Sequence, residues 1–147
     1  MNKKTAARHL TKNLLFTLLI SCGLTFLAIQ IIYSEVAGSL EGNSGIAILT
    51  IAGFFWTLVL TVSSLTVFFN VIDNVRHNLL ISILTFYFLP SLVTIIFYLR
   101  SDYSEMWSSF FIITGLYFLT HTYFFVKLRR LDIDKNADLK KIDEQTD

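Results

Sequence analysis

His121 is the strongest candidate for a chemically active side chain in this sequence, because it is the one ionisable group deep inside an apolar stretch. Ionisable groups within a membrane are costly and therefore mark candidate functional positions. Tyr117 lies one helical turn earlier and is expected on the same face. One interpretation makes His121 a proton-responsive group or a ligand contact. The other makes it a neutral imidazole that hydrogen-bonds a neighbouring helix, a contact worth about 0.6 kcal/mol.

Asp73, Arg76 and His77 form a second candidate set, in a short polar turn between two apolar stretches. Together with His121 they are the most site-like group in the chain, and all four are expected near the cytoplasmic face. A simpler interpretation is that Asp73 and Arg76, three residues apart, form an ion pair at a helix end. A metal or haem site is not predicted, because a second intramembrane histidine is missing and His9 lies in a polar tail.

Other chemistry finds little support in the sequence. A nucleophile beside a base, a glycine-rich phosphate loop and a pair of intramembrane carboxylates are all missing, so neither a catalytic nor a cofactor site is predicted. The net charge of +1 does not favour nucleic acid as a partner. The single cysteine, Cys22, excludes an internal disulfide and a thiolate metal site.

These residues lie in a chain with four apolar stretches, each of 20 residues or more. Roughly 20 helical residues cross a hydrocarbon core of ~30 Å, and a helix satisfies its own backbone groups in lipid. The sequence predicts an all-α membrane protein, a four-helix transmembrane bundle with up-down-up-down topology. The predicted parts are a tail at 1–12, a transmembrane domain at 13–127 with helices at about 14–33, 46–72, 79–99 and 106–126, and a tail at 128–147. Beyond Asp132 this tail is expected to be a frayed helix that ends in disorder.

The basic residues predict the orientation of the bundle. Eleven of the twelve Lys and Arg residues lie in the two tails and the polar turn, and only Arg100 lies on the other side. This bias puts both termini in the cytoplasm. Basic residues at that face are expected to contact anionic lipid head groups. The basic N-terminus and compact form are compatible with a bacterial cytoplasmic (inner) membrane.

The N-terminal region has an alternative interpretation. Residues 19–22, Leu-Ile-Ser-Cys, look like a lipobox, where bacterial lipoproteins are cleaved and acylated on cysteine. The apolar run continues beyond Cys22, which instead favours an uncleaved helix with a lipid-buried thiol. The orientation of the other three helices is the same in both cases.

Small hydroxyl residues and one proline predict how the helices pack. Small residues let helices approach closely in lipid, so the faces that carry them in the first and second helices are expected to meet. A water-filled path lined by these hydroxyls is the functional alternative. Proline removes a helical hydrogen bond and is expected to bend the third helix near residues 87–89. The predicted packing residues are Thr17, Ser21, Thr25, Thr57, Thr61, Ser64 and Pro90.

These observations favour a small multi-pass membrane protein that is not an enzyme and acts by intramembrane contact with another membrane protein or by self-association. Accessory subunits are one class of this kind. Bacterial immunity proteins, which block a membrane-attacking toxin in the same bilayer, are another, on an analogy of architecture alone. The alternative is a subunit of an oligomeric channel or transporter for ions or small molecules.

Overall fold

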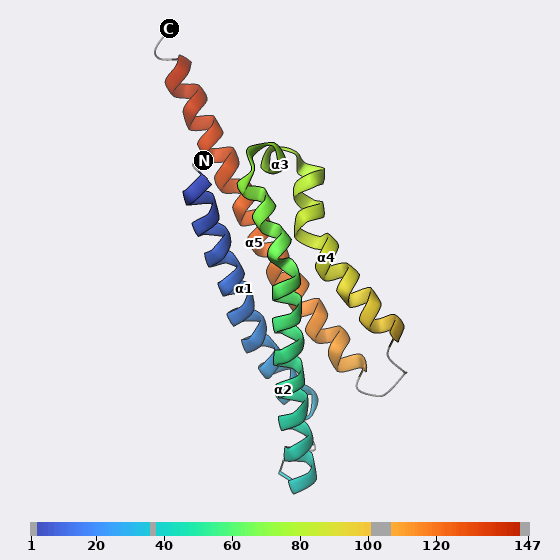
Figure 1. Ribbon diagram of the computed structural model, residues 1–147. Helices are drawn as coiled ribbons and strands as arrows, with labels where there is room; N and C mark the ends of the chain where they lie inside the picture. The colour runs from blue at the N-terminus through green and yellow to red at the C-terminus, as the bar shows by residue number, and fades with distance from the viewer. Residues whose placement is uncertain (1–2, 36–37, 101–106, 145–147) are drawn as a thin grey trace.

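The computed structural model is 94% helical, and its described residues form no β-strand, which confirms the predicted all-α class. It describes residues 3–35, 38–100 and 107–144, with side chains described except at 40, 41, 107 and 131–144. The helices, in chain order, are α1 (Lys3–Ile32), α2 (Leu40–Ser63), the 3₁₀ helix η1 (Ser64–Val71), α3 (Asp73–His77), α4 (Leu79–Arg100) and α5 (Trp107–Glu144) (Figure 1).

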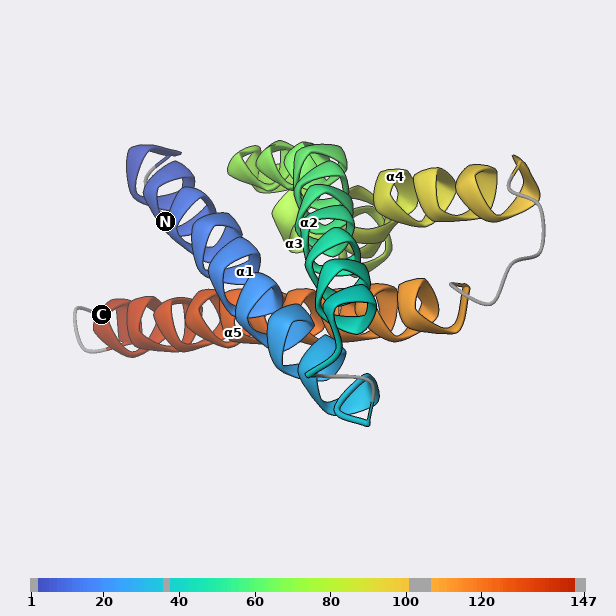
Figure 2. The same cartoon turned by 90° about the horizontal axis from the view of Figure 1, so that it is seen from below.

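Four helical segments are long and apolar enough to cross a membrane, as the sequence predicts. α1 packs obliquely across α5 and also contacts α2, while α4 lies against η1 (Figure 2). The four segments are Lys3–Ile32, Gly42–Val71, Leu79–Arg100 and Ser108–Arg130. This arrangement is that of an integral membrane protein built as a helical bundle.

Both polar tails are helical over more of their length than the sequence predicts. α1 begins at Lys3, inside the expected tail at 1–12, because Ala6 and Leu10 lie one turn apart and are both buried. Leu10 packs in one cluster with Leu128 of α5. α5 likewise continues through the expected tail to Glu144. The polar ends are therefore extensions of membrane helices.

The second span begins earlier than the predicted residue 46. Ser39 caps α2, and its hydroxyl accepts the backbone N–H of Gly42 at 3.0 Å. Gly38 precedes the cap with φ of 109°, a left-handed conformation that glycine adopts without strain. A capped helix start thus occupies part of the segment between the predicted helices at 14–33 and 46–72.

The C-terminal part of this span is tighter than an α-helix. From Ser64 to Val71 the chain forms the 3₁₀ helix η1, in which residues three apart lie in line. Ser64, Val67 and Asn70 have this spacing, and all three are buried. The turn predicted at 73–78 is the short helix α3.

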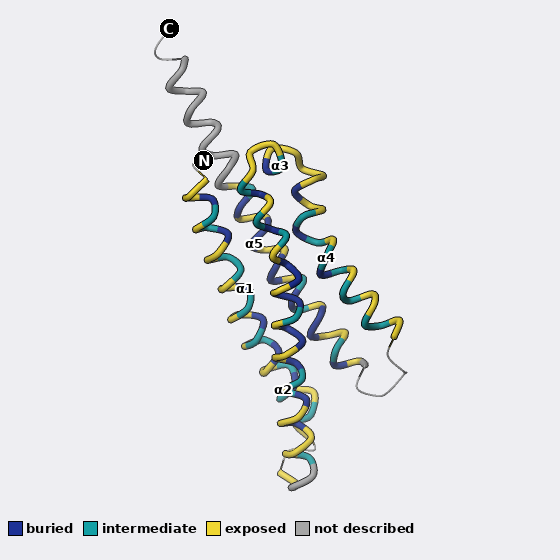
Figure 3. The backbone as a smooth tube through the Cα atoms, in the orientation of Figure 1, coloured by how far each residue is buried: buried dark blue, intermediate teal, exposed yellow. Residues whose placement is uncertain are grey.

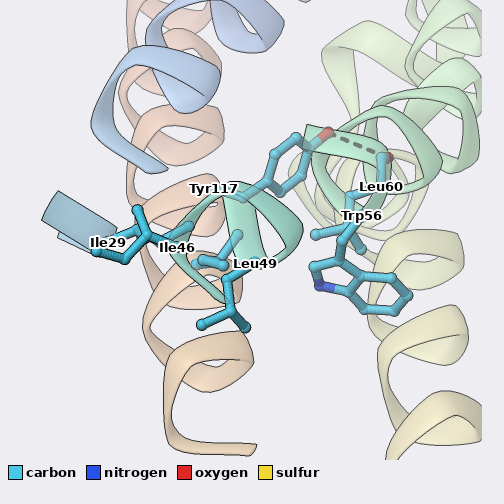
Figure 4. Close-up of a cluster of buried hydrophobic side chains, with 7 residues drawn as sticks. Ile29, Ile46, Leu49, Trp56, Leu60 and Tyr117 are labelled. Atoms are coloured by element: carbon cyan, nitrogen blue, oxygen red, sulfur yellow. Dashed lines mark hydrogen bonds between the residues drawn. The ribbon is translucent and has the colours of Figure 1, made fainter. Parts of the chain in front are cut away.

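The apolar core consists of two clusters. One joins the end of α1 to α2 and α5 and contains Ile29, Ile46, Leu49, Trp56, Leu60, Ile113 and Tyr117 (Figure 4). The other joins the start of α1 to η1, α4 and α5 and contains Leu10, Val67, Phe86, Phe125 and Leu128. Because the second cluster contains residues of four elements, it joins η1 and α4 to α1 and α5.

A close approach between helices lies at Gly53 of α2. A Cβ atom at this position would lie 2.8 Å from Cγ2 of Thr25 and 3.1 Å from Cδ1 of Ile113. Three helices therefore meet where glycine leaves room, as expected for packing in lipid. Gly23 and Gly115, by contrast, have no such neighbour within 4 Å.

α4 lies at the edge of the bundle and is its least buried span. Of its most apolar window 17% is buried, against 44% for the span in α5. Aromatic rings bridge it to α5, including Tyr87 against Phe118 and Tyr98 against Phe111. The axis of α4 changes direction partway along, and the helix contains Pro90, which the sequence predicts to bend it (Figure 1).

Buried and exposed residues are divided between the inside and the outside of the bundle (Figure 3). Large apolar side chains dominate the outer surface, such as Ile31 at 72%, Leu80 at 77% and Leu99 at 82% exposure. In water such a surface would be an aggregation hazard. It is compatible with contact between the helices and lipid chains.

Candidate functional site

His121 is buried on α5 and hydrogen-bonds the backbone of α4. Its Nε2 atom lies 3.1 Å from the carbonyl oxygen of Phe86. A carbonyl oxygen can only accept, so Nε2 carries the hydrogen and donates it. The imidazole also stacks on Tyr117 one turn earlier, with ring centroids 5.6 Å apart and an interplanar angle of 17°. The structure thus places these two predicted residues on one face.

The carbonyl that His121 contacts is the one that Pro90 leaves without a helical donor. In an α-helix each carbonyl accepts from the N–H four residues later, and Phe86 stands four residues before Pro90. Proline has no N–H. The imidazole of His121 therefore supplies, from a neighbouring helix, the donor that the helix itself lacks. Freed backbone groups in membrane helices need such substitutes.

Tyr117 joins α5 to the point where α2 becomes η1. Its hydroxyl donates to the carbonyl oxygen of Leu60 at 3.1 Å (Figure 4). The same hydroxyl lies 2.7 Å from Oγ of Ser64. All three residues are fully buried. The tyrosine hydroxyl therefore acts as a structural contact at the change from α to 3₁₀ geometry.

Asp73, Arg76 and His77 lie together on α3, at a distance from the environment of His121. Nη2 of Arg76 pairs with Oδ1 of Asp73 at 2.5 Å, and Nδ1 of His77 lies 2.8 Å from the backbone oxygen of Asp73. Arg129 of α5 donates to the backbone oxygen of Arg76. His121 instead lies against Phe86 and Tyr117. The geometry favours a helix-end ion pair, held to α5 by Arg129.

The described residues contain no group of three or more His, Cys, Asp or Glu side chains arranged to hold a metal ion. Cys22 is a free thiol of intermediate exposure on α1.

The predicted packing hydroxyls are buried, and several bond to their own helix. Thr17 donates to the oxygen of Asn13, Thr57 to that of Gly53 and Thr61 to that of Thr57, each at 2.8 Å. Such bonds satisfy the hydroxyl and turn the threonine methyl group outward, which favours close helix packing over a hydrophilic path.

Ser21 and Thr25 differ from these residues. Their hydroxyl oxygens are buried, and neither has a hydrogen-bond partner among the described residues. An unsatisfied buried hydroxyl is destabilising.

We therefore expect Thr25→Val to stabilise the bundle by about 1 kcal/mol, because it removes an unsatisfied hydroxyl at nearly constant shape. The measurement is the midpoint of SDS-induced unfolding in mixed micelles, followed by tryptophan fluorescence. Thr57→Val is the matched control, since it removes a hydroxyl that has a partner, and it should not stabilise. Equal effects of the two changes would contradict the assignment.

A further set of buried polar contacts attaches α4 to η1 through α4 residues that no sequence pattern marks. Oγ of Ser82 donates to Oδ1 of Asn70 at 2.6 Å, and Nδ2 of Asn70 donates to Oγ1 of Thr85 at 2.7 Å. Thr66 donates to the backbone oxygen of Thr85 at 2.6 Å. A lone amide in an apolar run signals the need for a partner, but the partner is visible only once the helices are placed.

Two more polar contacts connect helices across the other half of the bundle. Nε1 of Trp56 donates to Oγ1 of Thr114 at 2.9 Å, and the hydroxyls of Tyr33 and Ser109 lie 2.8 Å apart. Chemically, the contacts of Tyr117, His121, Asn70, Trp56 and Tyr33 are hydrogen bonds that join one part of the bundle to another. Comparison with protein-family models, curated proteins and solved structures finds no match to this chain. A functional proposal must therefore come from the geometry.

Proposed function

We propose that this chain is a non-enzymatic membrane protein that acts by contact with another membrane protein inside the bilayer, as an accessory subunit or an inhibitor of the immunity type. The observation that carries the proposal is the exposure of the outer, apolar face of α4. This helix is the least buried span, and it presents an apolar groove on its outer side, with Tyr87 at the edge that contacts α5.

The proposed topology follows from the charges. We place the start of α1, α3 and the C-terminal extension of α5 on the cytoplasmic side, with the four spans alternating in direction. Eleven of the twelve Lys and Arg residues then face the cytoplasm. Anionic head groups of a bacterial cytoplasmic membrane would lie against these bases.

The groove on α4 has a volume of about 260 Å³. Ser91 is its one small residue, and larger side chains flank it on both sides along the helix. Membrane helices associate where a small residue allows another helix to approach closely. Lipid chains are as apolar as the helix surface, so apolar burial alone does not favour a helix over lipid as the neighbour. Its lining residues are Ile83, Leu84, Tyr87, Phe88, Ser91, Leu92 and Ile95.

The inward face of α4 supports the same assignment. Ser82 and Phe86 are fully buried, and their partners lie in η1 and α5. These contacts hold the helix from one side, so the opposite face remains available to a transmembrane helix of a second protein. Because that face is apolar, shape complementarity would provide the selectivity.

Photocrosslinking in native membranes tests the proposal. The photoreactive analogue p-benzoylphenylalanine replaces Phe88 on α4 in one variant and Phe55 on α2 in another. These residues are 56% and 67% exposed, so both probes face outward. We expect a discrete protein adduct from position 88 and lipid adducts alone from position 55.

A second change tests the groove itself. Ser91→Phe fills the groove and should reduce the position-88 adduct about tenfold, since an overpacked contact costs about 1–3 kcal/mol. Ala47→Phe, at an exposed position of α2, is the size-matched control and should leave the adduct unchanged. Lipid adducts alone at position 88, or ion flux through proteoliposomes of the pure chain, would overturn the proposal in favour of an oligomeric channel or transporter subunit.

A further inference from the structure

The seam between α1 and α5 carries basic side chains at one end and exposed apolar side chains below them. Phe16 of α1 and Phe124 of α5 stack across this seam, with ring centroids 6.4 Å apart and an interplanar angle of 14°. Leu10 and Leu128 pack in one cluster farther toward the start of α1, so the two helices run in opposite directions. Counting helical turns from the phenylalanine pair therefore places the neighbouring residues of both helices along the seam.

Both helices carry bases beyond the phenylalanine pair, toward the same end of the bundle, and the exposed bases nearest the pair are Lys12 and Arg8 on α1 and Lys127 and Arg130 on α5. Lys12 lies one turn before Phe16, and Lys127 lies one turn after Phe124, so these two lysines flank the seam. Arg8 follows one turn farther on α1 and Arg130 on α5. All four bases are exposed.

Two open hollows lie at these bases. The one on α1 is lined by Lys4, Thr5, Arg8, His9 and Lys12, and the one on α5 by Tyr123, Val126, Lys127 and Arg130. No acidic residue occurs in α1 or between 108 and 130 of α5. Among the described side chains no carboxylate pairs with Arg8, Lys12, Lys127 or Arg130. The described surface at this end of the seam is therefore positively charged.

The surface below the bases is apolar. Phe16 and Ile20 of α1 are 50% and 43% exposed, and Leu119 of α5 is 70% exposed. Tyr123 lies between this surface and the bases, where an amphipathic ring prefers to sit in a membrane interface. A ligand that fits the whole seam has an anionic head and hydrocarbon chains.

We propose that this seam binds one phospholipid whose head group carries two phosphates. The pair of bases on each helix would neutralise one phosphate, and the acyl chains would run over Phe16 and the apolar surface below. A head group with a single phosphate would engage one pair and leave the other without a counter-charge. This inference rests on the proposed insertion with the basic end at the lipid head groups, but it does not depend on the protein partner.

Native mass spectrometry of the purified full-length chain in a non-ionic detergent tests the assignment. The probe is an equimolar mixture of diphosphatidylglycerol, phosphatidylglycerol and phosphatidylcholine. We expect one diphosphatidylglycerol to be retained. Lys12→Gln with Lys127→Gln should weaken this binding about 30-fold, because each base lost near an anionic surface lowers the affinity roughly fivefold.

The matched control removes the same charge elsewhere. Lys3→Gln with Arg100→Gln changes two exposed bases, one at the start of α1 and one at the end of α4, and should leave retention unchanged. Circular dichroism verifies that both double variants remain helical. Equal retention of one- and two-phosphate lipids would overturn the proposal, and so would displacement of the lipid by inorganic pyrophosphate, which would make free phosphate the ligand. If the unaltered chain retains no diphosphatidylglycerol while the position-88 adduct persists, this inference fails and the proposed function stands.

Discussion

Gly53→Leu should destabilise the bundle by about 3 kcal/mol, because it forces a large side chain into a close contact among three helices. The glycine faces Thr25 and Ile113, and even a methyl group there would lie 2.8 Å from Cγ2 of Thr25. Threonine is β-branched and cannot turn this atom away freely. α1 and α2 would have to separate. The expected result is a lower SDS midpoint for unfolding in mixed micelles.

Gly115→Leu is the control for the glycine prediction. It makes the same change in a helix that leaves open space at this position, and we expect less than about 0.5 kcal/mol. A rescue adds specificity, since Thr25→Ser removes Cγ2 and should make Gly53→Ala tolerable. Equal midpoints for the two leucine variants would show that the contact at Gly53 does not limit helix approach.

His121→Leu should destabilise the fold by about 2 kcal/mol, because it leaves the buried carbonyl of Phe86 without a donor. The decisive experiment is a double-mutant cycle with Pro90→Ala. Alanine restores the backbone N–H that can bond Phe86 within α4. The cost of His121→Leu should therefore fall by about 1–2 kcal/mol in the Pro90→Ala background.

His121→Gln separates the hydrogen bond from the ring. Its side-chain amide can donate in place of the imidazole, so this variant should keep much of the stability that leucine loses. Additive effects of His121→Leu and Pro90→Ala would contradict the compensation. A loss of partner adduct at position 88 without a loss of stability would instead favour the functional interpretation of His121.

The helical class and the four spans were predictable from the sequence for a simple physical reason. Lipid offers no hydrogen-bond partners, so an apolar stretch of this length must form a helix. The exact ends were not predictable by hydropathy. α1 starts at Lys3 because Ala6 and Leu10 contact the bundle, and hydropathy does not detect a packed face within a basic segment.

The residues of the candidate site were predictable from the sequence, but the hydrogen bonds that join them to other helices were not. His121 and Tyr117 follow from helical spacing, and a free carbonyl at Phe86 follows from Pro90. That His121 reaches this carbonyl depends on how α4 and α5 are placed side by side. Asp73 and Arg76 were correctly placed near each other by spacing, whereas the contact from Arg129 joins positions far apart in the chain.

The 3₁₀ geometry of η1 links the length of the second span to the attachment of α4. Rewinding its eight residues as an α-helix would shorten the span by about 4 Å. It would also rotate Asn70 by roughly 120° relative to Ser64, away from Ser82 and Thr85. The hydrogen bonds of Asn70 with Ser82 and Thr85 therefore fit the 3₁₀ geometry and not the α-helical one. A force that pulled α4 from the bundle would remove these contacts and would let the C-terminal end of the span rewind and move inward.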